Sequence, residues 1–258
     1  MSSETYSSSE IAAVTAARNI EDNRVVFVGT GLPLMATALA QRLHAPNIVI
    51  VFEGGQIQPR ITRKYMPFSP NDIRAGYRAI MLATPTDVLS LLQKGHIDYG
   101  FISGAQIDQY GNVNTSFIGD YTKPKTRLPG SGGANDIGSL ANKTIILTRH
   151  EKRRFVQKVD FITTPGNIDG EGREKRGLIF GKPFLIITGL AIMDFDTTLG
   201  KARIMALQPG VTKEKVLENM GFRPIIPESI EVLDPPTDEE LQILREIDPD
   251  GRWVEHPN

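Results

Sequence analysis

The sequence predicts an α/β protein with an open, mostly parallel sheet flanked by helices. Short runs of β-branched and other apolar residues alternate with stretches whose apolar residues recur at helical spacing. The order strand, loop, helix, strand over residues 24–52 is typical of parallel strands joined by a right-handed crossover. No internal repeat or linker divides the chain, so we expect a flexible tail over residues 1–9 and one domain over residues 10–258.

The first elements follow from residue type and spacing. Serines suited to an N-cap precede a helix expected over residues 10–20, and the run RVVFVG predicts a strand at 24–29. The next helix, at 30–43, has Pro33 near its first turn, where a missing N–H is harmless. The run IVIVF at 48–52 then predicts a strand that is buried on both faces.

The middle of the chain mixes helical patterns with glycine-rich loops. Two segments read as helices, at 73–82 and at 85–95, the second ending at a glycine. Residues 98–107 predict a strand that runs into a polar loop at 108–116. A long glycine-rich loop over 122–141 leads into a small helix.

The last third is expected to add strands and two capped helices. The strand candidates are the apolar runs at 143–149, 158–165, 183–195 and 202–209. Between them, the charged and glycine-rich stretch Asn167–Gly177 predicts a mobile surface loop. Thr212 is placed to cap a helix over 213–220, and Thr237 with Glu240 forms a capping box before a final helix ending at 247.

Composition excludes several classes of function. The formal net charge of -1 gives no reason to expect nucleic acid or an anionic membrane as a partner. The chain has no cysteine, which excludes disulfides, thiolate catalysis and Cys-based zinc sites. Its four histidines are scattered without metal-ligand spacing, so no metal is expected. No run of apolar residues is long enough to span a bilayer, and we expect a cytoplasmic protein.

The stretch IVIVFEGGQ, residues 48–56, holds the first candidate for chemistry. Glu53 comes at the end of an apolar strand, and the ends of strands in α/β sheets are where ligands bind. A solvated loop acid is the ordinary interpretation of such a residue. Gly54 and Gly55 favour a functional one, because glycines permit a close approach of the backbone or a turn with positive φ.

The turn Gly29-Thr30-Gly31 is a weak candidate for dinucleotide binding. Glu53 follows Gly31 at about the distance of a ribose-binding acid, but Leu34 occupies the position of the third glycine. A tight strand-to-helix turn explains this stretch equally well.

Several loops together carry a more specific signal. GTGLPL, FEGG, GAQID-x-YGN, GSGGAND, HEKRRF and LQPGVT occur in this order, each after or beside an expected strand. This ordered set resembles the β subunit of class I, glutaconate-type CoA-transferases, from about Glu10 to Gly251. The resemblance implies the fold of that family, an open α/β sheet, and a homologous α subunit as partner in a hetero-oligomer of α2β2 or α4β4 type.

The resemblance also places the family's catalytic glutamate on Glu53. Many members have Ser-Glu-Asn-Gly at this point, whereas this chain has Phe52 and Gly54 around the acid, which bears on substrate preference. The implied reaction moves CoA from an acyl-CoA to a carboxylic acid through a thioester between CoA and Glu53, with ping-pong kinetics. CoA is then a substrate and covalent intermediate, and no cofactor is bound permanently.

The glycine-rich loops are the candidates for binding the reacting groups. Backbone N–H groups of Gly132 and Gly133 in GSGGAND are expected to stabilise the oxyanion, next to the positive end of a helix. Asn112 is a candidate for positioning the substrate carbonyl or carboxylate. The basic cluster at 152–154 is expected on a solvated face, outside the catalytic set. The pocket for CoA and substrate is expected to be lined by Gly29, Gly31, Gly54, Gly55 and Gly104.

Two other classes of function stay open at this stage. Relatives with this fold hydrolyse, open a ring in, or decarboxylate a CoA ester, and a water admitted to the anhydride would give a hydrolase. A non-catalytic ligand-binding subunit is the third possibility. A neighbouring gene for an α subunit would favour the transferase. The acyl group, the acceptor acid and the oligomeric state are not determined by the sequence.

Overall fold

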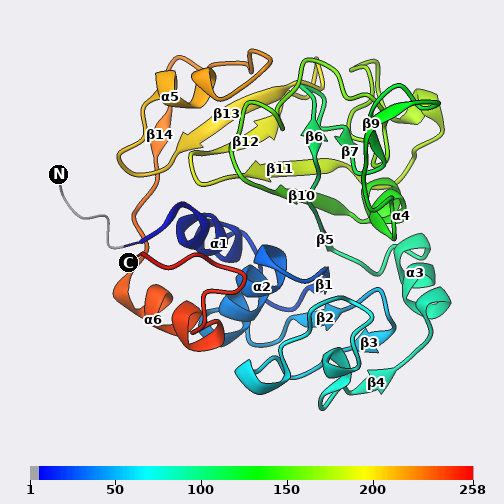
Figure 1. The fold of residues 1–258 in the computed structure, drawn as a ribbon, viewed down its shortest axis with the longest axis vertical. Helices are drawn as coiled ribbons and strands as arrows, with labels where there is room; N and C mark the ends of the chain where they lie inside the picture. The colour runs from blue at the N-terminus through cyan, green and yellow to red at the C-terminus, as the bar shows by residue number, and fades with distance from the viewer. Residues whose placement is uncertain (1–5, 258) are drawn as a thin grey trace. The chain divides into compact units, whose positions relative to one another are not determined.

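The computed structural model describes residues 6–257, and contacts divide the chain into two compact units (Figure 1). The first unit contains the described residues up to Phe101 together with the C-terminal segment from Pro235 onward. The second unit is Ile102–Asp234. The expectation of a single domain stays a prediction.

The strands of the first unit follow the order β5-β1-β2-β3-β4. β1 pairs in parallel with both β2 and β5, whereas β2, β3 and β4 pair antiparallel. The bounds are β1 Val25–Phe27, β2 Val49–Val51, β3 Gln56–Ile57, β4 Met81–Leu82 and β5 Tyr99–Ile102. The parallel centre is apolar, as expected, with Phe27, Ile50 and Tyr99 almost fully buried.

Three of the four α-helices of the first unit begin at side-chain caps that the sequence encodes, and α2 begins at Gly31 without one. Capping boxes open α1, α3 and α6, and Thr237 with Glu240 is one of them, as predicted. α1, α2 and α6 pack against one another (Figure 1). The bounds are α1 Ser8–Arg18, α2 Leu32–Leu43, α3 Pro85–Gln93 and α6 Asp238–Ile247, with 3-10 turns η1 Arg63–Tyr65 and η2 Ile73–Gly76.

The second unit has strands in the order β14-β13-β12-β11-β10. β10–β11 and β13–β14 are parallel pairs, and β11, β12 and β13 form an antiparallel meander. These strands are β10 Lys143–Leu147, β11 Pro183–Ile187, β12 Ala191–Phe195, β13 Ala202–Leu207 and β14 Glu231–Val232. Two small hairpins pair β6 Gln106–Ile107 with β7 Val113–Asn114 and β8 Phe117–Gly119 with β9 Pro124–Arg127. The helices are α4 Ala134–Leu140 and α5 Lys213–Glu218, with the 3-10 turn η3 Glu174–Arg176.

The predicted α/β class with an open sheet and flanking helices is confirmed, with antiparallel pairs added to the parallel ones. Within residues 6–257, no helix is long and apolar enough to cross a membrane.

Several local expectations were wrong, and pairing with distant strands explains most of them. Residues 73–82 are not a helix: after η2, Ile80 N–H donates to Ile57 O (3.0 Å) and the chain joins β3 as β4. The stretch 158–165 forms no strand, and only an isolated bridge joins Thr164 to Val113. The strand expected at 98–107 is broken into β5 and β6, and the neighbouring loops contain β7 and β9.

The N-terminal tail is shorter than expected. Ser7 caps α1, and its side chain accepts the backbone N–H of Glu10 at 3.0 Å, so residues 7–9 are ordered in the cap and the helix. Glu10 itself is fully buried and pairs with Arg245 at 2.7 Å. The part of the tail expectation that concerns residues 1–5 lies outside the described residues.

Candidate active site

Glu53 stands on a tight turn between β2 and β3. Gly55 N–H donates to Phe52 O (3.0 Å), and Phe52 N–H donates to Gln56 O (2.9 Å), which closes the turn. β2 ends at Val51, so the carboxylate lies two residues beyond the strand and not at its last position. Phe52 is fully buried and anchors the turn, whereas Glu53 is half-buried. Within residues 6–257, no hydrogen bond or ion pair engages the Glu53 carboxylate, which leaves it available for chemistry.

The Gly29–Gly31 turn leaves the sheet beside the Glu53 turn. Phe27 and Val51 are register partners at the ends of parallel strands, and Val28 N–H donates to Val51 O at 3.0 Å. β1 lies between β2 and β5 in the sheet. The chain passes from β1 to β2 on one side of β1, and the later strand β5 pairs with β1 on its other side, so the order of strands reverses at β1. Ligands of open α/β sheets bind outside the carboxyl ends of strands at such a reversal. The structure therefore brings Glu53 and this turn together where a ligand is expected.

The four glycines of these two turns differ in what they contact. A Cβ on Gly55, whose φ is +101°, would lie 2.1 Å from Ala83 O, and one on Gly54 would lie 2.6 Å from Pro70 O. Gly31 has a φ of +85° and begins α2. A Cβ on Gly29 would have no neighbour within 4 Å. Gly54 and Gly55 thus admit the protein's own backbone, and Gly29 alone borders open space.

Two aromatic residues that sequence reasoning missed adjoin the Gly29–Gly31 turn. The Thr30 hydroxyl donates to Phe68 O at 3.4 Å, and the Trp253 ring lies 3.9 Å from the position of a Cβ on Gly31. Phe68 and Trp253 meet edge to face, and Arg252 lies 4.5 Å from the centre of the Phe68 ring. Trp253 is the chain's single tryptophan, in the polar stretch GRWVEHPN, which is the signal that could have identified it.

In the second unit, Gly132 and Gly133 precede α4. The backbone N–H groups of both residues lack a hydrogen-bond partner within the described part of the chain. The left-handed conformation falls on Gly132 (φ +46°), while Gly133 has a φ of −78°. Asn135 Nδ2 donates to Thr163 O at 3.0 Å and fixes the start of the helix. Two unused backbone donors are therefore held side by side.

Asn112 is almost fully buried, and its amide is used within the protein. Nδ2 donates to both oxygens of Asp108 (3.1 and 3.0 Å) and to Ile168 O (2.8 Å), while Oδ1 accepts the N–H of Gly166 at 2.9 Å. Burial raises the pKa of the Asp108 carboxyl, and the Asn112 amide opposes that rise. These contacts join the 108–112 turn to the 166–168 loop. The expectation that Asn112 positions a substrate stays a prediction.

Gly104 and the basic cluster have contacts within the protein. A Cβ on Gly104 would lie 2.1 Å from Val113 Cγ1, so the glycine allows β6 and β7 to pair. Arg154 donates to Gly104 O (2.8 Å) and to Glu151, whereas Lys152 and Arg153 are exposed. The expectation that the basic cluster lies on a solvated face is thus correct for Lys152 and Arg153 but not for Arg154.

Arg173 shows that the stretch 167–177 is anchored and not simply a surface loop. The residue is 93% buried, and its guanidinium donates to Gly166 O (2.6 Å), Gly138 O (2.8 Å) and Phe180 O (3.2 Å). Burial lowers its pKa to about 10. No carboxylate pairs with it within residues 6–257. The arginine therefore ties the last turn of α4 to the loop that contacts Asn112.

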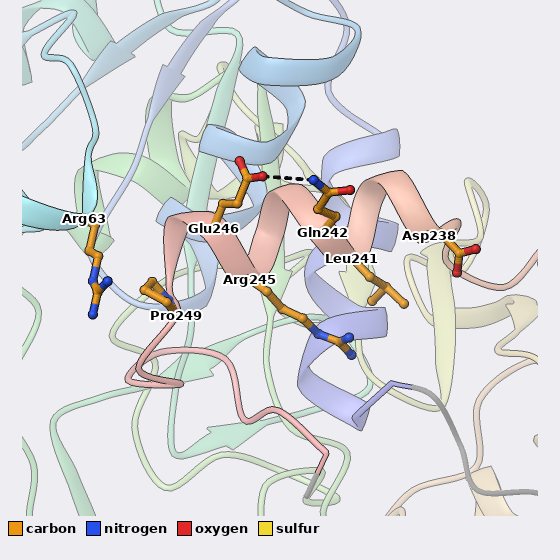
Figure 2. A pocket seen from close by; sticks show the side chains of 7 residues that line it. All are labelled: Arg63, Asp238, Leu241, Gln242, Arg245, Glu246 and Pro249. Atoms are coloured by element: carbon orange, nitrogen blue, oxygen red, sulfur yellow. Dashed lines mark hydrogen bonds between the residues drawn. The ribbon is translucent and has the colours of Figure 1, made fainter.

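A hollow of about 880 Å³ lies along α6 in the first unit and contains none of the predicted site residues (Figure 2). Gln242 and Glu246 hydrogen-bond at 3.1 Å along the helix, and Arg245 points to the other side (Figure 2). Three of the charged side chains that line the hollow are paired: Arg63 with Asp250, Glu246 with Arg42 and Arg245 with Glu10. We assign no ligand to it. Among the described residues, no three His, Asp or Glu side chains gather as a metal site would require.

The structure thus brings Glu53, Gly29, Gly31, Gly54 and Gly55 together in the first unit. Gly104, Asn112, Gly132 and Gly133 belong to the second unit, where Asn112 is linked to the end of α4 through the 165–166 loop and Arg173.

Known proteins match this arrangement over nearly the whole chain. The model of the coenzyme A transferase family matches residues 9–219. The chain is 40% identical to the B subunit of glutaconate CoA-transferase from Acidaminococcus fermentans, over 98% of this chain and 96% of that one. It is 38% identical to the B subunit of 3-oxoadipate CoA-transferase from Pseudomonas knackmussii, over 94% of each.

Solved structures agree with these matches. The crystal structure of the Acidaminococcus fermentans glutaconate coenzyme A-transferase superimposes with a TM-score of 0.90 over 98% of each chain. The decarboxylase AibA/AibB superimposes with a TM-score of 0.83 at 25% identity, over 96% of this chain and 99% of that one.

Proposed function

Because this chain belongs to the coenzyme A transferase family, we propose that it is the B subunit of an enzyme that moves CoA from an acyl-CoA to a carboxylic acid, with Glu53 as the nucleophile. The observation that carries the proposal is the placement of an unpaired, half-buried carboxylate at the reversal of strand order, beside a glycine turn that borders open space. The resemblance recognised in the sequence is confirmed at the level of the family.

The proposed reaction begins when a Glu53 carboxylate oxygen attacks the thioester carbonyl carbon. The carbon–sulfur bond breaks, CoA leaves as a thiolate, and an anhydride joins the acyl group to Glu53. The thiolate sulfur then attacks the carboxyl carbon of Glu53. The bond between that carbon and the bridging anhydride oxygen breaks, and the acyl group departs with this oxygen as the first carboxylate, leaving CoA in thioester linkage to Glu53.

The acceptor acid reverses these two steps. Its carboxylate attacks the Glu53 thioester and releases CoA thiolate, which then attacks the acyl carbon and frees Glu53. Each step exchanges a carboxylate for a thiolate or the reverse, so no proton is gained or lost. A chain with no cysteine and scattered histidines therefore has the groups that this chemistry needs.

Each addition forms an oxyanion that requires fixed hydrogen-bond donors. We assign this role to the backbone N–H groups of Gly132 and Gly133, which have no partner within the described residues. Loss of one such donor costs roughly 3–4 kcal/mol in the reaction barrier. Arg173 contributes indirectly, because it fixes α4, which follows these glycines.

The proposal includes a partner chain and a class of acid. The two relatives of highest identity reported above are B subunits by name, so we infer an A subunit for this protein. Their named acids, glutaconate and 3-oxoadipate, have two carboxyl groups, which makes dicarboxylic acids the first substrates to test.

The decisive experiment traps the covalent intermediate. The chain, co-expressed with the A subunit, is incubated with acyl-CoA alone and then treated with borohydride, which reduces the Glu53 thioester to an alcohol. Mass spectrometry should find the change on the peptide that contains Glu53. Glu53→Gln should lower transfer at least about 10⁴-fold, as expected when the nucleophile of a covalent enzyme is lost. Glu53→Asp should also fail, because the carboxylate retreats by about 1.5 Å, one carbon–carbon bond.

The outcomes separate transfer from its alternatives. Consumption of acyl-CoA without a label on Glu53, together with an active Glu53→Gln variant, would replace the transferase by a hydrolase or decarboxylase. Matched thermal unfolding of the variants and the wild type would show that the loss of activity is chemical, since the Glu53 carboxylate makes no hydrogen bond or ion pair within residues 6–257.

A further inference from the structure

After α6 the chain returns to the Gly29–Gly31 turn through residues Asp248–His256, the C-terminal segment. The Asp248 carboxylate accepts the backbone N–H groups of three residues of this segment: Arg252 (3.0 Å), Trp253 (2.7 Å) and Val254 (2.9 Å). Val254 is fully buried, and His256 Nδ1 lies 3.0 Å from a buried carboxylate of α1. The segment is therefore anchored on both sides of the pair Arg252 and Trp253, which fixes where these two side chains begin.

Trp253 and Phe68 form an aromatic wall beside the Gly29–Gly31 turn. The Trp253 ring lies 3.9 Å from the position of a Cβ on Gly31 and meets the Phe68 ring edge to face. Its indole N–H is buried and has no hydrogen-bond acceptor within residues 6–257, so packing and not hydrogen bonding holds the ring in place. The wall therefore adjoins the same turn on which Gly29 borders open space.

The stretch of chain that carries Phe68 also contacts the Glu53 turn. Pro70 O lies 2.6 Å from the position of a Cβ on Gly54, and Phe68 O accepts a hydrogen bond from the Gly29–Gly31 turn. Consecutive Cα atoms are 3.8 Å apart, so those of Phe68 and Pro70 lie at most about 7.6 Å from each other. The aromatic wall, the open space and the Glu53 turn thus belong to one region of the first unit.

Arg252 places an unpaired positive charge on this wall. Its guanidinium lies 4.5 Å from the centre of the Phe68 ring, and no carboxylate pairs with it within residues 6–257. Arg74 lies 4.2 Å from the centre of the same ring, but its charge is neutralised by Asp72. A cation–π contact uses none of the N–H donors of a guanidinium, and their planar arrangement binds a carboxylate through two parallel hydrogen bonds.

The C-terminal segment lies outside the part of the chain that matches the family, which is residues 9–219. A segment beyond the shared region is suited to a property in which members of a family differ. The choice of acid is such a property, because the two B-subunit relatives are named for different acids, glutaconate and 3-oxoadipate.

We propose that Arg252 determines substrate specificity by binding the second carboxylate of a dicarboxylic acyl group, while the Phe68 and Trp253 rings contact the carbon chain of that group. The inference rests on the proposed function, because it takes Glu53 as the group that attacks the thioester. A monocarboxylic acyl group of the same length offers no charge to Arg252, so the site should discriminate against it.

The first test compares two five-carbon thioesters in the complex with the A subunit, with acetate as the acceptor. Glutaryl-CoA has a second carboxylate and valeryl-CoA has none. Arg252→Met keeps an unbranched side chain but removes the charge, so it should lower kcat/KM for glutaryl-CoA about 10–100-fold and leave kcat/KM for valeryl-CoA nearly unchanged. Arg252→Lys should recover part of the activity with glutaryl-CoA. Thermal unfolding confirms that each variant folds.

Arg223→Met is the matched control. It removes the charge of an arginine in the second unit that is also exposed and has no ion pair within the described part of the chain. This variant should change kcat/KM for neither thioester.

Fluorescence supplies a second measurement that does not depend on CoA transfer. Trp253 is the chain's single tryptophan, so the emission that a complex loses in the Trp253→Phe variant belongs to this residue. Millimolar glutarate should change this emission in the wild type and in Arg223→Met, but not in Arg252→Met. Valerate should leave it unchanged.

The outcomes separate this inference from the proposed function. The inference would be overturned by a Trp253 emission that does not respond to glutarate, by an equal loss of kcat/KM for both thioesters in Arg252→Met, or by a wild-type complex that does not prefer glutaryl-CoA to valeryl-CoA. A complex whose Trp253 emission responds to glutarate through Arg252, but which does not transfer CoA, would overturn the proposed function alone.

Discussion

Gly55→Ala should destabilise the protein strongly, because the added methyl group has no room. The φ of Gly55 is +101°, and a Cβ there would lie 2.1 Å from Ala83 O and 2.7 Å from Ala83 C. The left-handed conformation costs a side chain about 1–2 kcal/mol. Separating the turn from β4 adds about 1–3 kcal/mol, the usual cost of overpacking. The total of about 2–5 kcal/mol corresponds to a fall in Tm of roughly 4–20 °C for a chain of this size.

Gly29→Ala is the matched control, since it makes the same change where a Cβ would have no neighbour within 4 Å. Its Tm should stay unchanged or rise slightly, because alanine restricts the unfolded chain by about 0.4–1 kcal/mol. Both variants are melted by differential scanning calorimetry, then assayed for KM and kcat with the A subunit. A Gly55→Ala variant that melts with the wild type would refute this account of the turn. A rise in KM for Gly29→Ala alone would show that substrate occupies the open space.

Two further predictions concern the second unit. Gly132→Val should lower kcat more than Gly133→Ala does, because Gly132 has a positive φ of +46° that a side chain rarely adopts, whereas Gly133 has a φ of −78°. Equal effects in folded variants would assign the loop to structure. His150 is half-buried, its Nε2–H donates to Val216 O (3.2 Å), and desolvation lowers its pKa from 6.5 to about 4. Between pH 6.5 and pH 4 this histidine is therefore protonated in the unfolded chain but neutral in the folded chain. The free energy of unfolding should decrease by about 3 kcal/mol as pH falls from 6.5 to 4. Urea titrations across this pH range should show that the free energy of unfolding of His150→Gln depends less on pH than that of the wild type. An equal dependence on pH in the two proteins would exclude His150 as the cause of the wild-type decrease.

The sequence by itself determined the elements whose signals are local. The capping box of Thr237 and Glu240 predicted the start of α6, and β-branched runs predicted the parallel strands around β1. It also selected Glu53, because a carboxylate between an apolar strand and two glycines occupied a recognisable place in an ordered set of motifs. Such features depend on neighbours in the chain, which the sequence displays directly.

Only the tertiary structure decided the features that depend on distant segments. Residues 73–82 have a helical pattern, but hydrogen bonds to β3 draw their end into a strand. Gly54 and Gly55 were expected to make room for a ligand, whereas the structure shows them accommodating the backbones of Pro70 and Ala83. Trp253 reaches the Gly31 turn from the far end of the chain. Close packing of the folded chain selects these contacts. They cannot be predicted from neighbouring residues, because the backbone or ring that fills the space beside a glycine can come from any part of the sequence.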